Sequence, residues 1–190
     1  YTYFNKNEDL KFPVFLKPIE GSSSKNTFKI DSSFDFDYYI KKFPNSVIQE
    51  YISEKEYTVD CLSDKNCNSI VAVIRERILV KDGKSVIGKT IKNEKIKFEV
   101  ERLLKKLRLI GPSNVQLFYC EKKEEIKFIE INPRLAAGGL PLSLGSGVNI
   151  PELMMRISDG ENIYYQNYTQ NTLMIRYLTE IFIYENDQSS

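Results

Sequence analysis

The chain has 190 residues, of which 42% are hydrophobic and 28% charged, and its formal net charge is +1. This is the composition of an ordinary globular protein with one domain or two small ones, long enough to bury a core. The small net charge gives no electrostatic reason to expect a nucleic acid or a membrane as a partner, and no apolar run approaches the roughly 18 residues that span a bilayer.

The first fifty residues favour strands at Phe12–Pro18, Thr27–Ile30 and Val47–Ile52 and a helix at Ser33–Phe43, capped by Asp31 or Ser32. The first strand carries Lys17 near its end, beside the small-residue loop Glu20–Lys25. Such a loop can offer backbone N–H groups and hydroxyls to phosphates, with Lys17 supplying a point charge. Taken alone, a loop of this kind is more often a simple turn.

The middle of the chain favours strands at Glu56–Leu62, Ile70–Ile74 and Ile78–Val80 and an amphipathic helix at Ile96–Leu109. Between the second and third strands, Arg75 and Arg77 are expected on a solvated strand face. A turn is expected at Lys81–Lys84. We expect the helix to present Phe98, Val100, Leu103, Leu104 and Leu107 to the core and to be ended by Gly111-Pro112.

Two runs rich in β-formers, Val115–Cys120 and Ile126–Ile131, flank a charged loop and predict an antiparallel hairpin. We expect Cys120 to pair with Ile126. In that register one face is apolar and packs into the core through Val115, Leu117, Ile129 and Ile131. A slip of one residue would turn polar side chains inward, so the register is well specified.

The other face of the hairpin carries Gln116 opposite Glu130, with Asn132 two residues further on. Three oxygen-bearing side chains at a strand end suit a hard cation such as Mg²⁺. Arg134 follows, and a guanidinium beside such a site can bind an oxyanion through two parallel hydrogen bonds. The alternative is a surface hairpin with a polar face, and the local pattern alone does not choose between the two.

Beyond the hairpin we expect a helix at Ile150–Ser158, with Pro151 in its first turn, and one strand or a strand pair within Leu173–Tyr184. The chain is therefore predicted to be α+β with mostly antiparallel sheet.

Histidine is absent from the sequence. This excludes imidazole-based triads, metal ligation and acid–base chemistry. Lysine, arginine, carboxylates, amides and a hard metal remain, and phosphoryl transfer needs little else. The three cysteines (Cys61, Cys67 and Cys120) lack a paired spacing and indicate free thiols in a reducing, cytoplasmic setting.

Several short motifs occur in one order: Lys17-Pro18 with its Gly/Ser loop, Gln49-Glu50-Tyr51-Ile52, Glu56-Tyr57, Asn114-Val115-Gln116 and Glu130-Ile131-Asn132-Pro133-Arg134. Together they resemble the ATP-grasp superfamily, and most closely its carbamoyl-phosphate synthase large-chain-like branch. The resemblance covers roughly residues 12 to 160. Its most specific part is the last pair of motifs.

The resemblance implies an ATP-grasp fold, with two α+β subdomains whose mostly antiparallel sheets enclose a nucleotide cleft. Residues 1–52 would be the small lid subdomain with the phosphate loop and the adenine hinge. Residues 53–190 would be the larger subdomain with the magnesium site. The implied cofactors are ATP and Mg²⁺. The superfamily's preceding N-terminal domain has no counterpart here, so we expect the chain to be a fragment of a longer enzyme.

By the same resemblance, the ATP-binding residues would be Lys17 for the α- and β-phosphates, Gly21, Ser22, Ser23 and Ser24 for the closing loop, Glu50, Tyr51 and Ile52 for the adenine hinge and Glu56 for the ribose. The implied metal ligands are Gln116, Glu130 and Asn132, and the implied catalytic residue is Arg134, facing the acyl phosphate. Two features depart from the usual pattern, because the phosphate loop is poor in glycine and Gln116 replaces a metal-binding carboxylate.

The activity implied is that of a carboxylate–amine (or ammonia) ligase acting through an acyl phosphate. Its partners would be a small-molecule carboxylate and an amine or ammonia, and a homodimer is a possible assembly. The alternative is a non-catalytic nucleotide-binding module that keeps the fold. The set Gln116, Glu130, Asn132 and Arg134 favours the ligase, since a binding module has little need of magnesium ligands.

Overall fold

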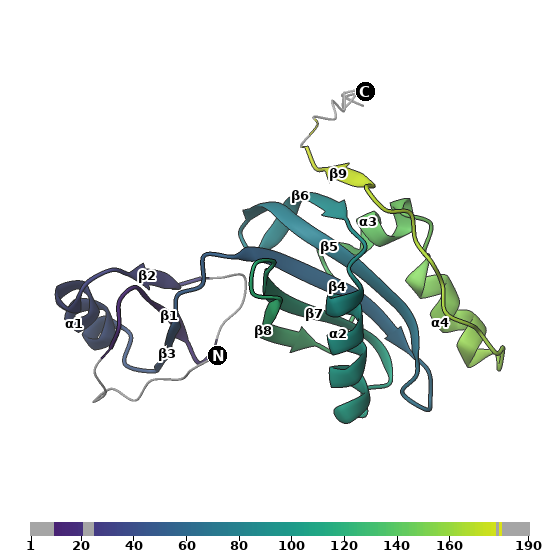
Figure 1. The fold of residues 1–190 in the computed structure, drawn as a ribbon, viewed down its shortest axis with the longest axis horizontal. Helices are drawn as coiled ribbons and strands as arrows, with labels where there is room; N and C mark the ends of the chain where they lie inside the picture. The colour runs from purple at the N-terminus through teal and green to yellow at the C-terminus, as the bar shows by residue number, and fades with distance from the viewer. Residues whose placement is uncertain (1–9, 21–24, 178, 180–190) are drawn as a thin grey trace, which may run out of the picture.

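The structure, a computed structural model, describes residues 10–20, 25–177 and 179, and two antiparallel sheets organise this part of the chain (Figure 1). The smaller sheet has the order β2-β1-β3, formed by β1 (Val14–Pro18), β2 (Phe28–Ile30) and β3 (Ser46–Glu50). Helix α1 (Ser33–Lys42) packs on it and starts at Ser32, whose hydroxyl accepts a hydrogen bond from the N–H of Asp35. Their shared core consists of Val14, Leu16, Ile30, Phe36 and Ile48.

The larger sheet has the order β8-β7-β4-β5-β6-β9. Its strands are β4 (Lys55–Ser63), β5 (Ser69–Lys81), β6 (Lys84–Thr90), β7 (Gly111–Cys120), β8 (Glu125–Asn132) and β9 (Leu173–Ile175). Helix α2 (Glu94–Lys106) packs on one face, and the short α3 (Leu140–Gly145) and α4 (Ile150–Ser158) pack on the opposite side of the fold (Figure 1).

Alternation along the strands gives the two faces of the larger sheet different characters, since successive side chains point to opposite sides. Toward α2 the sheet is apolar, with Tyr57, Val59, Cys61, Ala72, Ile74, Val115 and Leu117. The opposite face is apolar only at one end, where Leu62, Val71 and Val73 pack with α4. Its other end carries the polar residues Thr58, Asp60, Arg75, Asn114 and Gln116.

The α+β class, the antiparallel pairing and several elements confirm the sequence predictions. Helix α4 has the predicted bounds, with Pro151 in its first turn. The turn between β5 and β6 consists of Asp82 and Gly83, whose φ angles of 51° and 71° match a two-residue hairpin turn that favours Asp-Gly. Cys61, Cys67 and Cys120 are free thiols.

Arg75 and Arg77 do not lie on a solvated strand face, so that prediction is wrong. Strand β5 continues unbroken to Lys81, and β6, which was not predicted, covers its far edge. The Arg75 side chain is buried against Asp60, and the Arg77 side chain is only 6% exposed. Both arginines therefore belong to the interior of the polar half of the sheet.

Helix α2 begins and ends earlier than predicted. Asn93 caps its start by accepting a hydrogen bond from the N–H of Ile96, and the helix ends at Lys106. Arg108 then takes a left-handed backbone with φ 54°, so this residue stops the helix and Gly111 opens β7. Phe98 is 61% exposed and Leu107 is 50% exposed, so neither joins the core.

The hairpin of β7 and β8 has the predicted register at its functional end and a different one beyond it. Gln116 pairs with Glu130 as expected, but a bulge follows and Leu117 pairs with Phe128. Ile129 is the extra residue, and it lines a cleft instead of the core. The predicted pairing of Cys120 with Ile126 is therefore wrong by one residue.

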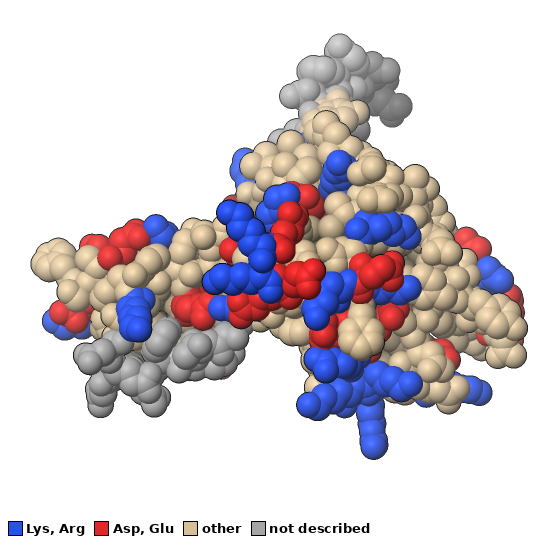
Figure 2. Space-filling model, viewed as in Figure 1, with Lys and Arg blue, Asp and Glu red and all other residues tan. Residues whose placement is uncertain are grey.

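At the C-terminal end, only Leu173–Ile175 of the predicted strand region forms a strand, and most of the region after it lies outside the described residues. Within the described ranges, no helix has both the length and the apolarity to cross a bilayer. Acidic and basic side chains are interspersed over much of the face in Figure 2, with lysine and arginine gathered at one end of α2.

Candidate functional site

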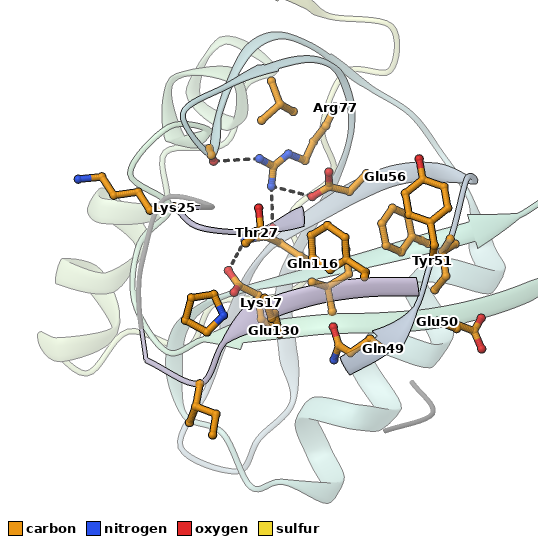
Figure 3. A pocket seen from close by; sticks show the side chains of 18 residues that line it. Lys17, Lys25, Thr27, Gln49, Glu50, Tyr51, Glu56, Arg77, Gln116 and Glu130 are labelled. Carbon is orange, nitrogen blue, oxygen red and sulfur yellow. Dashed lines mark hydrogen bonds and ion pairs between the residues drawn. The ribbon is translucent and has the colours of Figure 1, made fainter. Parts of the chain in front are cut away.

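A cleft of about 380 Å³ lies where the smaller sheet meets the polar half of the larger one (Figure 3). This is within the size range of small-molecule sites. It brings together seven residues that the sequence singled out: Lys17, Glu50, Tyr51, Ile52, Glu56, Gln116 and Glu130. The predicted loop residues Gly21, Ser22, Ser23 and Ser24 lie outside the described residues, but Ile19, Lys25 and Thr27 on either side of them line the same cleft.

Strand β1 places Lys17 in the cleft by simple alternation. Val14 and Leu16 are fully buried in the core of the smaller sheet. Phe15 and Lys17 therefore face the other way, and both line the cleft. A lysine in this position presents a compact positive charge to an anion bound between the two sheets.

The predicted hinge follows the end of β3 and lines the cleft. The side chain of Glu50 forms an ion pair with Lys127 of β8, and in Figure 3 its carboxylate points away from Gln49. Tyr51 and Ile52 come next, in irregular backbone, and line the cleft. The Glu50 side chain thus joins the two sheets, and the irregular backbone of Tyr51 and Ile52 follows it at the cleft.

Gln49 belongs to the Gln49-Glu50-Tyr51-Ile52 motif, but no role was predicted for its side chain. It is 1% exposed, lines the cleft, and its Nε2 has no hydrogen-bond partner within the described part of the chain. A buried amide donor without a partner is costly, so a ligand that accepts from it would remove the cost. Alternation could have indicated it, because Ile48 faces the core and its neighbour must face the cleft.

Arg77 connects three parts of the site (Figure 3). Its Nη1 donates to Gln116 Oε1 at 2.7 Å and lies 3.0 Å from Glu56 Oε1, and its Nη2 donates to the carbonyl of Gly83 at 2.9 Å. Its Nε is buried without a partner among the described residues. Burial raises the pKa of Glu56, with Arg77 opposing this shift and Glu130 adding to it, and burial also lowers the pKa of Arg77.

The proposed metal ligands converge on one carboxylate oxygen. Glu130 Oε1 accepts from Gln116 Nε2 at 2.6 Å and from Asn132 Nδ2 at 2.7 Å. No cluster of three or more His, Cys, Asp or Glu side chains placed for a metal occurs in the described ranges. A metal here would use Glu130 with the amide oxygens of Gln116 and Asn132, which requires each amide to turn over. For Gln116 this turn also breaks the hydrogen bond that its Oε1 accepts from Arg77, so Arg77 would have to move with it. One carboxylate with neutral oxygens, phosphates and water is a donor set that fits Mg²⁺.

Arg134 is fixed just beyond this cluster. Its N–H donates to the carbonyl of Asn132 at 2.8 Å, and its own carbonyl accepts from Asn114 Nδ2 at 3.1 Å. The side chain is exposed and lines a second pocket of about 170 Å³. This pocket shares Arg77, Gly83, Gln116 and Glu130 with the cleft. The guanidinium therefore adjoins the metal-ligand set without lining the cleft itself.

A buried ion pair supports the floor of the second pocket. Arg75 donates from Nε and Nη2 to the two oxygens of Asp60, each at 2.7 Å, and Ser143 of α3 donates to the same carboxylate at 2.5 Å. Gly139 lies directly on the guanidinium, because a Cβ there would be 2.0 Å from the Cζ of Arg75. Only glycine leaves room for this contact.

A small sheet with a lysine-bearing strand, facing a larger antiparallel sheet with amide and carboxylate groups across a cleft, defines the ATP-grasp fold. The chain belongs to the ATP-grasp family described as "ATP-grasp in the biosynthetic pathway with Ter operon", whose model matches residues 42–181. This confirms the resemblance stated from the motifs.

Known proteins agree with this assignment. The chain is 27% identical over 172 residues to the carbamoyl phosphate synthase large chain of Thermotoga petrophila, which covers 82% of this chain and 15% of the relative. The structure resembles an ADP complex of N5-carboxyaminoimidazole ribonucleotide synthetase, with a TM-score of 0.71, 19% identity and coverage of 87% and 46%. It also resembles biotin carboxylase from Campylobacter jejuni, with a TM-score of 0.67 and 17% identity, over 85% of this chain and 40% of that protein. The chain spans only 15% of the length of this carbamoyl phosphate synthase and 7% of a second curated relative, the mitochondrial acetyl-CoA carboxylase of Saccharomyces cerevisiae, to which it is 23% identical over 163 residues.

Proposed function

We propose that the chain is the catalytic portion of an ATP-dependent ligase that phosphorylates a carboxylate and passes the acyl group to an amine or ammonia. The observation that carries this proposal is the cleft, which gathers a lid-strand lysine, a backbone hinge and a convergent amide–carboxylate cluster, with Arg134 in the adjoining pocket. The names of the relatives, a carbamoyl phosphate synthase and a biotin carboxylase, support the same reaction class.

In this proposal each part of the site has a chemical role. Lys17 binds the inner phosphates, and the hinge at Tyr51 and Ile52 binds the adenine through peptide groups. Residues 1–52 act as the lid, with the loop of Gly21–Ser24 closing over the phosphates and excluding water. Glu56 binds the ribose hydroxyls. We also place the reaction in the cytoplasm, where the three cysteines would stay reduced.

Gln116, Glu130 and Asn132 would hold Mg²⁺, which would neutralise charge on the transferring phosphoryl group. A substrate carboxylate oxygen attacks the γ-phosphorus, the bond to the bridging oxygen breaks, and ADP leaves. The amine then attacks the acyl carbon and expels phosphate, and the amine loses a proton to solvent. Arg134 binds the negative charge of the acyl phosphate and of the tetrahedral adduct.

Acid-dependent release of ADP, measured with and without Mg²⁺ for the protein and for three variants, tests this function. Glu130→Gln removes the only carboxylate of the ligand set and should abolish turnover with the fold unchanged. Arg134→Ala should lower turnover about 100- to 1,000-fold while ATP affinity changes little. Glu121→Gln makes the same change as Glu130→Gln on the exposed hairpin loop and should have no effect.

Each failure has a distinct meaning. Normal turnover in Glu130→Gln would remove the metal assignment. A parallel loss of ATP affinity and turnover in Arg134→Ala would make that residue an ATP ligand instead of an acid-binding one. Tight ATP binding without turnover in the wild-type protein would favour the non-catalytic nucleotide-binding module.

A further inference from the structure

The second pocket has two walls that the fold holds together. One wall is the β5–β6 turn, which Arg77 anchors by donating from Nη2 to the carbonyl of Gly83. The other is the chain after β8, where Gly138 packs on Lys84: a Cβ on that glycine would lie 3.4 Å from the Cβ of Lys84. Lys84, the first residue after the turn, is therefore placed at the contact between the walls.

The lining of this pocket contains four basic and two acidic side chains. Its basic side chains are Arg75, Arg77, Lys84 and Arg134, and its acidic side chains are Asp82 and Glu130. Arg75 is paired with Asp60, and Arg77 with Glu56. Among the described residues, neither Lys84 nor Arg134 forms an ion pair. The two cations come from different walls, so the pocket has two separate points for binding an anion.

Size and polarity restrict what can enter. The volume is about 170 Å³, less than half that of the cleft. Alanines Ala136 and Ala137 supply the only apolar side chains of the lining, and the rest is polar, charged or glycine. A ligand with a large aliphatic or aromatic group would find no apolar surface to cover it. The pocket suits a small polar acid.

We infer that the acid activated by this protein is a small acid with two anionic groups, termed a dianion below. Its reacting carboxylate lies at Arg134 and the Gln116–Glu130 pair, and its second anionic group, a carboxylate or a phosphate, binds Lys84. This inference rests on the proposed ligase function and adds the substrate class to it. Arg134 lines the second pocket together with Gln116 and Glu130, which also line the cleft where a phosphoryl group would arrive. Lys84 is the remaining cation without an ion-pair partner within the described part of the pocket lining.

Binding to the protein loaded with Mg²⁺ and ADP tests the inference. Succinate would be compared with butyrate, and 3-phosphoglycerate with glycerate, by titration calorimetry. At least one dianion should bind about tenfold more tightly than its matched monoanion, the effect of one charge-assisted contact. Lys84→Gln should remove this preference and leave the affinities for the monoanions and ADP unchanged.

Lys81→Gln is the matched control, since Lys81 pairs with Lys84 across the same turn and lines neither pocket. It should behave as the wild type. Dianions that bind no more tightly than monoanions, or a Lys84→Gln variant that equals Lys81→Gln, would overturn the inference.

Acid-dependent ADP release with the same compounds and hydroxylamine as acceptor separates this inference from the function on which it rests. Dianion binding that depends on Lys84, without ADP release for any acid, would refute the ligase function and leave the anion pocket standing. ADP release that is as fast with monoanions as with dianions, and unchanged by Lys84→Gln, would keep the ligase and refute the dianion.

Discussion

Breaking the buried ion pair between Arg75 and Asp60 should cost more stability than breaking any exposed pair of the described chain. Both side chains are 3% exposed, and two hydrogen bonds of 2.7 Å join them. Ser143 adds a third bond from α3 to the same carboxylate. Asp60→Asn removes one charge and leaves a guanidinium buried without its counter-ion. Arg75→Met leaves the carboxylate of Asp60 buried without its counter-ion.

The loss of unfolding free energy expected in each single variant follows from this burial. Removing one partner of a buried ion pair costs about 3–5 kcal/mol, because the other charge stays desolvated. Replacing both partners by apolar residues of similar volume is often neutral or stabilising. The double variant Asp60→Leu with Arg75→Met should therefore recover most of the stability that either single change removes. With a typical urea slope of about 2 kcal/mol/M, each single variant should shift the midpoint by roughly 1.5–2.5 M.

Urea unfolding followed by circular dichroism would measure the wild type, both single variants and the double variant. Arg156→Met is the control, because Arg156 forms its ion pair with Glu161 at the surface, where little change is expected. A loss below about 1 kcal/mol in either single variant would contradict the burial reasoning. So would a double variant that is less stable than both single variants, since removing both charges should leave no buried charge without a partner.

Three further predictions concern packing, pH and the joint between the sheets. Gly139→Ala should cost about 1–3 kcal/mol by forcing a methyl group onto the buried guanidinium, whereas Gly145→Ala, where a Cβ meets nothing within 4 Å, should not destabilise. Burial raises the pKa of Tyr168 to about 12, so the stability that the neutral hydroxyl contributes is complete below about pH 10 and is lost as pH rises through 12. The thermal midpoint of Tyr168→Phe should therefore fall less at alkaline pH than that of the wild type. Equal slopes of thermal midpoint against pH in the two proteins would refute this. Lys127→Gln removes the ion pair with Glu50 and should cost less than about 1 kcal/mol, and this difference should disappear in about 1 M salt; a cost that persists at that salt concentration would contradict the prediction.

Features set by neighbouring residues could be predicted from the sequence. Helix α4 starts at an asparagine followed by Ile150-Pro151, and the β5–β6 turn contains Asp-Gly, so both signals are complete within a few residues. The pairing of Gln116 with Glu130 was also predictable, because a slip would bury both polar side chains. These local signals placed the metal-ligand candidates opposite each other.

Features decided by tertiary packing could not be predicted in the same way. Alternation puts Arg75 and Arg77 on one face of β5, but it does not tell whether solvent or protein covers that face. The bulge that turns Ile129 toward the cleft depends on what packs against β8. The burial of Gln49 without a partner for its Nε2 likewise depends on what packs around β3. The left-handed residue that ends α2 is Arg108, a residue type with no strong preference for that conformation.

The division of one sheet face into an apolar and a polar half explains how a small domain can hold a precise polar site. On β4, Leu62 packs beneath α4, while Thr58 and Asp60, on the same side of the same strand, enter the second pocket or support its floor. The residues between them, Val59 and Cys61, are buried against α2. The strand is thus fixed from both sides by apolar contacts within a few residues of the site. Preorganised polar groups need such support, because their advantage over water is that they do not have to reorient when charge develops.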